Sequence, residues 1–126
     1  MHIKDMYICG MYSKELLKGT LKTIILKMLS ESDSMYGYQI TQKVKEITEG
    51  KIILTEGALY PALHKLEADG FLTTEKQTVG NRVRKYYSLT QTGNGRAKEK
   101  VEELKEFMET LTTIINLTPQ KLAWQI

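Results

Sequence analysis

The sequence has very little of several residues on which common functional sites depend. Its 126 residues include one cysteine, two histidines and two prolines. A single cysteine excludes an internal disulfide and a multi-cysteine zinc site, and it suits a reducing compartment. His2 and His64 are too far apart in the chain to form a local metal-binding pair. We therefore expect no metal centre and no cofactor.

Long apolar runs are also missing. Lys22 and Lys27 interrupt the longest candidate, so no segment reaches the ~20 residues of a membrane-spanning helix. The N-terminal residues lack the sustained apolar stretch of a signal peptide. Glycine-rich phosphate loops and nucleophile elbows are absent as well. These absences predict a cytoplasmic protein that is not an enzyme and does not bind a membrane.

What is present suits one small domain with a core. Hydrophobic residues make up 41% of the chain and the net charge is +3, which permits a nucleic-acid partner without demanding one. Residues 1–13 show no clear period, and we interpret them as an N-terminal arm. Residues 117–126 are expected to form a C-terminal tail, which contains Pro119 and the only tryptophan, Trp124.

Two amphipathic helices are expected in the first half of the chain. Apolar residues recur at helical spacing over 14–30, where Leu17 lies on the apolar face, and polar residues follow over 31–34. The second helix is expected over 35–48, with Gly50 as its stop. A buried stripe of this helix would contain Ile40, Val44 and Ile47. Residues 52–54 would then form a short strand or an extended link.

A third helix is expected after Thr55, whose hydroxyl can accept a bond from an unpaired N–H of the first turn. Leu54 and Leu59 have the spacing of a hydrophobic staple around this cap. Leu59, Leu63 and Leu66 share one face, and Gly70 can end the helix. The opposite face carries Glu56, Tyr60, His64 and Lys65. By itself this pattern is more typical of an ordinary amphipathic helix with a solvated face than of a binding helix.

Beyond Gly70 the hydrophobic period changes to two, which indicates strands. Residues 71–78 and 83–90 flank a Gly80-Asn81 turn and predict a β-hairpin. Arg82, Arg84 and Lys85 give its second strand a basic character. This cluster is either a solubilising hairpin tip or a contact for phosphates.

Thr90 is then expected to cap a long helix over 91–116, which Pro119 would end. Its apolar residues recur at intervals of four and three, the spacing of a heptad seam. So long a seam at the end of a small domain favours pairing with a second copy. The alternative is a helix folded back on its own core. Leu17 and seven residues of this helix would form the dimer interface: Ala97, Val101, Leu104, Phe107, Met108, Leu111 and Ile115.

The order of elements predicts a mainly α-helical fold with a small β-hairpin (α+β). Its residues 14–90 would form a winged helix-turn-helix and residues 91–116 a long C-terminal dimerisation helix. In that arrangement the third helix enters the major groove of DNA and the basic hairpin, the wing, follows the backbone.

The residues at these positions resemble the PadR family of bacterial transcriptional regulators. The resemblance covers about residues 14–116 and is carried by Gly37-Tyr38, the run EGALYPALHKLE from Glu56, Gly70, and RKYYSLTQTG from Arg84. It implies a dimeric winged helix-turn-helix repressor that binds a palindromic operator and is released by an effector. The DNA-binding residues expected from the pattern and the resemblance are Tyr38, Gln39, Glu56, Gly57, Ala58, Tyr60, Pro61, His64, Lys65, Asn81, Arg82, Arg84 and Lys85.

The sequence departs from the family pattern at two places. The family usually has threonine where this chain has Ala58, which removes one hydroxyl near the DNA. Multidrug-binding members have a tryptophan on the dimerisation helix, where this chain has Leu104 or its neighbour. The candidate effector pocket is therefore apolar, formed by Leu104, Phe107 and Met108, and would take a small apolar or aromatic molecule. An aromatic residue and a methionine at helical spacing, here Phe107 and Met108, are more often part of a core than of a pocket.

A second class of function fits the same fold. The low net charge and the acidic residues Glu56, Glu67 and Asp69 on or near the third helix are compatible with a winged-helix module that binds protein and not DNA. A gel-shift assay at low salt separates the two hypotheses. The sequence indicates neither the effector, the regulated gene nor the operator.

Overall fold

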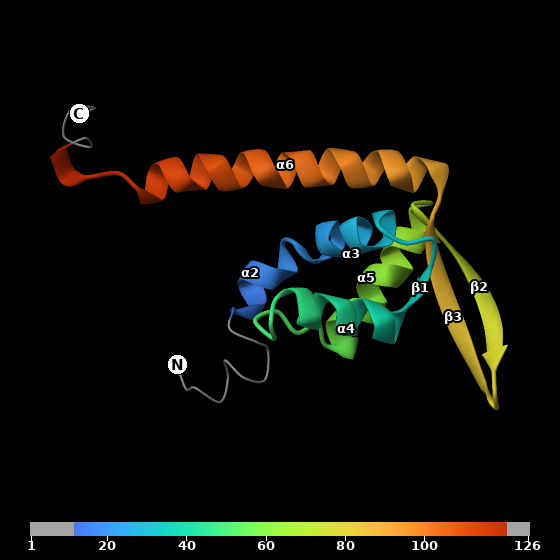
Figure 1. The fold of residues 1–126 in the computed structure, drawn as a ribbon. Helices are drawn as coiled ribbons and strands as arrows, with labels where there is room; N and C mark the ends of the chain where they lie inside the picture. The colour runs from blue at the N-terminus through green and yellow to red at the C-terminus, as the bar shows by residue number, and fades with distance from the viewer. Residues whose placement is uncertain (1–11, 121–126) are drawn as a thin grey trace.

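The computed structural model describes residues 12–120, and in these the predicted order of helices and hairpin is confirmed (Figure 1). The predicted arm up to residue 11 and Trp124 in the tail lie outside the described residues. The elements are α2 (Lys14–Lys18), α3 (Leu21–Ser30), β1 (Met35–Tyr36), α4 (Gly37–Ile47), α5 (Glu56–Ala68), β2 (Leu72–Val79), β3 (Arg82–Leu89) and α6 (Gln91–Ile115).

The core lies where α3, α4 and α5 meet one another and the upper part of the sheet (Figure 1). Its members are apolar and almost fully buried, which is the main source of the stability of the domain. They are Ile25, Leu26, Leu29, Met35, Ile40, Val44, Leu54, Leu59, Ala62, Leu63, Leu66, Leu72, Tyr87 and Ala97.

The prediction of one helix over residues 14–30 is wrong in one respect, because the structure has two helices there. Gly19 ends α2, and the Thr20 hydroxyl donates hydrogen bonds to the carbonyls of Leu16 and Leu17, at 3.3 and 3.2 Å. These bonds satisfy carbonyls that a continuous helix would have paired with later N–H groups. The apolar period continues across the break, which is why the sequence pattern did not show it.

The second helix begins two residues later than expected. Met35 and Tyr36 form the short strand β1, which pairs with Tyr87 and Tyr86 of β3. The sheet therefore has three antiparallel strands in the order β1-β3-β2, and the sequence predicted the hairpin of β2 and β3 but not β1. The Tyr36 N–H donates to the Gln39 side chain at 3.1 Å, and this bond starts α4.

The end of α4 also differs from the prediction. Ile40 and Val44 are buried as expected, but Ile47 is 63% exposed and does not belong to the buried stripe. Gly50 has a φ of +80° and donates its N–H to the Lys45 carbonyl at 2.8 Å, so it ends the helix as predicted.

The third helix, α5, agrees with the prediction at both ends. The Thr55 hydroxyl accepts a hydrogen bond from the Ala58 N–H at 3.3 Å, and Leu54 and Leu59 are both buried beside this cap. Gly70 has a φ of +84°, which lets the Phe71 N–H reach the Leu66 carbonyl at 3.0 Å. The helix is thus fixed in the core by one face, which leaves the other face to the outside.

The hairpin and the long helix confirm the predicted second half. Val79 pairs with Arg82 across the two-residue turn, where Gly80 has a φ of +63°. Thr90 caps α6 by accepting a bond from the Gly93 N–H at 2.9 Å. The first turns of α6 pack on α3 through Ala97, and the distal half extends past the domain (Figure 1).

Within residues 12–120, no helix is both long and apolar enough to cross a membrane. No group of three or more His, Cys, Asp and Glu residues in the same part of the chain could hold a metal ion.

Candidate DNA-binding surface

The outward face of α5 is built by the burial of its opposite face. Because Leu59, Ala62, Leu63 and Leu66 are fixed in the core, the other face of the helix points outward. Glu56, Gly57, Ala58, Pro61, His64 and Lys65 are all exposed, as a DNA-reading helix requires. In Figure 1 the N-terminal end of α5 and the tip of the wing lie on the side of the domain away from α6.

Two of these helix residues have local constraints. Pro61 has no N–H to offer the Gly57 carbonyl one turn earlier, so the exposed start of α5 keeps an acceptor that a regular helix would pair. Lys65 forms an ion pair with Asp69 at 3.0 Å, one turn later on the exposed face. Such a pair contributes little to stability and leaves the lysine able to exchange partners.

A hollow of about 370 Å³ separates α5 from the wing and brings together residues that are distant in sequence. Tyr60 and His64 line it from α5, and Arg84 and Lys85 line it from β3. Its other lining residues are Tyr36, Gly37, Val83 and Tyr87. The predicted helix contacts and wing contacts therefore share one surface.

Tyr60 occupies its place because residue 37 has no side chain. A Cβ atom at Gly37 would lie 2.5 Å from the Tyr60 hydroxyl oxygen and 2.8 Å from the ring carbon that carries it. The Tyr60 ring is thus half-buried against the start of α4, with its edge at the hollow. The sequence placed Gly37 near the start of α4 but gave no indication of its contact with Tyr60.

Arg84 is held by aromatic stacking. Its guanidinium carbon lies 4.5 Å from the centre of the Tyr36 ring, a cation–π distance, and Tyr36 meets the Tyr86 ring edge-on at 5.3 Å. The stack orients the charge of Arg84 on the surface that contains Tyr60. Tyr36 was absent from the predicted site because β1, which places it there, was not predicted.

Lys85 is engaged within the protein. Its ammonium lies 3.5 Å from the Glu67 Oε1 and 5.4 Å from the centre of the Tyr87 ring. Thr74 donates to the other Glu67 oxygen at 3.0 Å, so Glu67 joins both wing strands to α5. The charge of Lys85 is partly neutralised before any DNA approaches, whereas Asn81 and Arg82 are exposed at the tip.

The two predicted contacts at the start of α4 also differ in whether their side chains are engaged within the protein. Tyr38 is exposed and remains a candidate contact. The side chain of Gln39 is used in the cap of α4 through its bond from the Tyr36 N–H, so its amide oxygen is already engaged. Tyr87, behind this surface, is buried, and burial raises the pKa of its hydroxyl.

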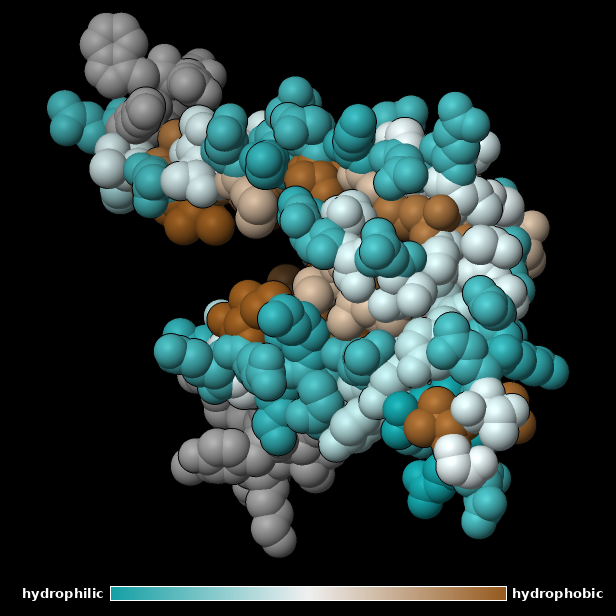
Figure 2. Space-filling model, turned by 45° about the vertical axis from the view of Figure 1, so that its right-hand side comes forward, coloured by the Kyte–Doolittle hydropathy of each residue, from teal (hydrophilic) through white to brown (hydrophobic). Residues whose placement is uncertain are grey.

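A second surface follows the predicted seam of α6. Phe107, Met108, Leu111 and Ile115 are exposed, and Val101 and Leu104 are half-buried. Figure 2 shows hydrophobic residues on the side of α6 that faces the open space between this helix and the rest of the domain. Leu17 of α2 is half-buried. Ala97 is only 2% exposed because it packs in the core of the protomer, so it is removed from the predicted interface.

Comparison with known proteins agrees with this architecture. The chain matches the transcriptional regulator PadR-like family over residues 25–99. It is 31% identical over 93 residues to the transcriptional regulator Rv3488 of Mycobacterium tuberculosis, covering 74% of this chain and 83% of that protein. It is 30% identical over 102 residues to an uncharacterised protein of Lysinibacillus sphaericus, covering 80% and 93%.

Solved structures give the same result. A transcriptional regulator from Clostridium thermocellum superposes with a TM-score of 0.75 at 27% identity, covering 82% of this chain and all of that one. A PadR-like transcription factor from Bacteroides fragilis has a TM-score of 0.65 at 35% identity, covering 79% and 94%. With its winged-helix fold, its exposed α5 and its family match, this chain belongs to the PadR-like family of transcriptional regulators, which bind DNA and are not enzymes.

Proposed function

We propose that this protein is a homodimeric repressor that binds a palindromic operator and leaves it when a small effector binds. The observation that carries the proposal is the placement of two unlike surfaces on one domain. The polar face of α5 and the wing lie on one side of the domain. The exposed apolar residues of α6 belong to a helix on the opposite side, which extends beyond the domain (Figure 1).

The stripe of α6 supports the dimer. Phe107 is 57% and Ile115 is 76% exposed, on a helix whose heptad spacing suits an identical partner. Burying one large apolar side chain contributes about 1.5–3 kcal/mol, so most of the stripe would have to be buried to exceed the roughly 4–15 kcal/mol cost of association. The interface residues under this proposal are Leu17, Val101, Leu104, Phe107, Met108, Leu111 and Ile115.

The surface of α5 and the wing supports operator binding. Two such surfaces related by a two-fold axis would meet successive major grooves about 34 Å apart, so the operator is a palindrome. Arg82 at the tip and Arg84 on its tyrosine stack are placed to neutralise phosphates beside the helix. Tyr60 and His64 border the same hollow, where Tyr60 would offer its hydroxyl to a phosphate.

The effector pocket of this proposal forms only when two copies meet. Leu104, Phe107 and Met108 lie along one side of α6, and in the single chain Phe107 and Met108 are open to solvent. A partner helix would enclose them in an apolar cavity at the symmetry axis. A small apolar or aromatic molecule there would change the distance between the two reading helices.

Two measurements test the proposal. Selection of bound sequences from a random DNA pool should enrich a palindrome with half-sites about one helical turn apart. Light scattering should give the mass of two chains. A single-chain mass at micromolar concentration would refute the dimer, and enrichment of single half-sites would refute the palindrome. A pool with no enrichment, together with no gel shift at low salt, would favour the protein-binding module.

Repression and release need a third measurement. Transcription from a promoter that carries the selected operator should fall when the protein is added and recover when an effector is supplied. An increase in transcription on addition of the protein would make it an activator.

A further inference from the structure

Near its end, α5 places a carboxylate against the wing. Glu67 follows Tyr60 and His64 at helical spacing, so the three side chains lie along one side of the helix. Tyr60 and His64 line the hollow between α5 and the wing, together with Lys85 of β3. The Glu67 Oε1 lies 3.5 Å from the ammonium nitrogen of Lys85. A negative charge is therefore placed beside the surface that is proposed to meet phosphates.

The contacts of this carboxylate fix its position but leave Lys85 accessible. Thr74 of β2 donates its hydroxyl hydrogen to the Glu67 Oε2 at 3.0 Å, while Oε1 faces Lys85. The Lys85 side chain is 37% exposed and that of Glu67 is 34% exposed, so water reaches both. Their separation exceeds the ~2.7–2.9 Å of a tight charge-assisted hydrogen bond, and an ammonium has three N–H donors. The pair is therefore open to exchange with an incoming anion.

The register of the hairpin suggests a competing role for Glu67. Lys76 of β2 lies directly opposite Lys85 of β3, so the two side chains are on the same face of the sheet. Lys76 is exposed, and no ion pair among residues 12–120 includes it. Like charges that are directly opposite in a sheet repel one another. Glu67 could serve the structure alone, by offsetting this repulsion and stabilising the wing.

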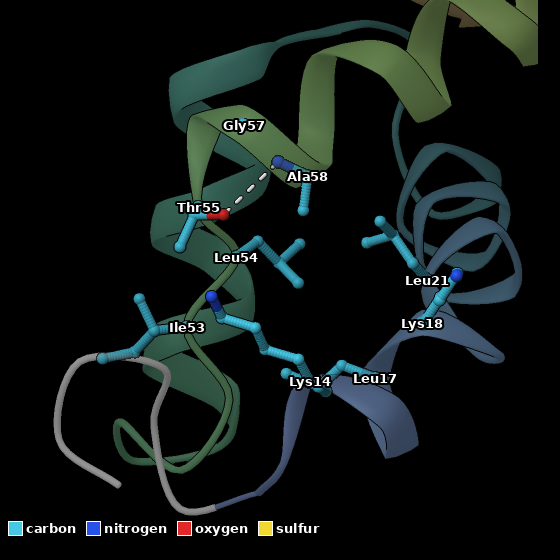
Figure 3. A pocket seen from close by; sticks show the side chains of 9 residues that line it. All are labelled: Lys14, Leu17, Lys18, Leu21, Ile53, Leu54, Thr55, Gly57 and Ala58. Carbon is cyan, nitrogen blue, oxygen red and sulfur yellow. Dashed lines mark hydrogen bonds between the residues drawn. The ribbon is translucent and has the colours of Figure 1, made fainter. Parts of the chain in front are cut away.

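The start of α5 has no comparable carboxylate. Lys14 and Lys18 lie at opposite edges of a cavity beside the first turn of this helix (Figure 3). None of the nine residues that line the cavity is acidic, and neither lysine belongs to an ion pair within residues 12–120. Lys85 thus has a counterion that the lysines at the other end of α5 lack.

We propose that Glu67 limits the affinity of this protein for DNA, because it holds Lys85 until a phosphate competes for the ammonium. No ion pair in the described part of the chain includes Arg82 or Arg84, so these two charges of the wing are available at once. Lys85 reaches a phosphate only by giving up its contact with Glu67. A phosphate contact carries no sequence information, so Glu67 should lower the affinity for every duplex by the same factor. This inference rests on the wing contact of the proposed function, but not on its palindrome, dimer or effector.

Glu67→Gln tests the charge alone, because its amide oxygen can still accept the bond from Thr74. Affinity is measured over a salt series for the selected operator and for a duplex of random sequence. At low salt the variant should bind both about fivefold more tightly, the upper end of what one exposed charge pair contributes. The slope of log affinity against log salt should steepen by up to about one unit, because the freed lysine adds a phosphate contact.

The matched control is Glu103→Gln on α6, which removes the same charge and an ion pair with Lys100. In Figure 1 this helix lies on the side of the domain away from the wing tip. Charges farther from the DNA than the ~10 Å screening length contribute little, so the control should change the affinity less than about twofold.

Lys85→Met gives a second test, which does not depend on the folding of the Glu67 variant. Methionine keeps an unbranched side chain near Tyr87 and removes the charge. In the otherwise wild-type protein it should change the salt slope by less than about half a unit, because Glu67 already holds the ammonium. In the Glu67→Gln background it should lower the slope by about one unit.

Four outcomes would overturn the inference. They are a gain in Glu67→Gln no larger than in Glu103→Gln, a gain for the operator alone, an equal loss of slope on Lys85→Met in both backgrounds, and weaker DNA binding by a less stable Glu67→Gln. The last result would leave Glu67 the structural role of offsetting the two lysines. A protein that binds DNA but gives any of these results fails only this inference. A monomeric mass or enrichment of single half-sites fails only the proposed function, and absence of DNA binding by every variant fails both.

Discussion

Two glycines of α6, only two residues apart, should respond in opposite directions to the same substitution. A Cβ atom at Gly93 would lie 2.0 Å from the Phe71 carbonyl oxygen and 2.9 Å from the carbonyl carbon. At Gly95 the same atom meets nothing within 4 Å. Gly95→Ala should therefore stabilise the protein by up to about 1 kcal/mol, the ordinary difference in helix propensity.

The cost of Gly93→Ala follows from the contacts around Phe71. The clash is with backbone, so the start of α6 must move away from the end of α5. The Thr90 N–H donates to the Phe71 carbonyl at 3.0 Å and the Thr90 hydroxyl to the Gly70 carbonyl at 2.7 Å, and the movement weakens both bonds. Overpacking costs about 1–3 kcal/mol and each lost bond about 0.5–1.5 kcal/mol. After the propensity gain of about 1 kcal/mol, we expect a net destabilisation of about 1–5 kcal/mol.

Urea unfolding followed by circular dichroism measures the difference. All three proteins must be compared at one concentration, because association of copies contributes to apparent stability. Wild-type stability in Gly93→Ala, or a gain equal to that of Gly95→Ala, would refute the tight approach of α6 to Phe71.

Three further predictions concern charge and association. Arg82→Ala and Arg84→Ala should each lower the slope of log affinity for DNA against log salt by about one unit if each contacts a phosphate; an unchanged slope would remove that contact. Leu111→Asp should give monomers in light scattering, because a dimer would bury its charge in an apolar seam, and a retained two-chain mass would contradict the seam. Tyr87 has a raised pKa in the folded state, so its contribution to stability is complete below pH 10 and is lost as pH rises through the folded value. Urea midpoints on either side of pH 10 should show a fall that is smaller in Tyr87→Phe.

The sequence predicted the elements whose ends are marked by strong local signals, such as capping residues and glycines. Thr55 and Thr90 are hydroxyl caps with an N–H within reach, and Gly70 and Gly80 have the positive φ for which only glycine is well suited. These features depend on neighbours within a few residues. Their positions were therefore predictable to within one or two residues.

What the sequence did not predict depends on contacts between distant segments. Met35 and Tyr36 form a strand because β3 is present to pair with them, some fifty residues later in the chain. Ala97 follows the heptad period of the seam, yet it is buried in the core because α3 lies against it. A period shows which residues share a face, but not which neighbour covers that face.

The candidate site likewise combines features that the sequence predicted with features that it did not. The exposed face of α5 and the basic strand of the wing follow from period and composition. The packing of Tyr60 against Gly37 and the stacking of Arg84 on Tyr36 join positions more than twenty residues apart. No local sequence pattern indicates such contacts. Lys85 was predicted as an equal of Arg84, but Glu67 lies close enough to share its charge.

The attachment of α6 at one end only has a mechanical consequence. Its first turns are fixed to the domain at Gly93 and Ala97, while the distal half of α6 extends beyond the domain (Figure 1). In the proposed dimer the helix is a stiff lever between the symmetry axis and the DNA. A slip of one helical turn where the two levers meet would displace each by about 5.4 Å, a substantial error against a groove repeat of about 34 Å. The fit of the dimer to its operator therefore depends on contacts along α6 that lie far from the bases.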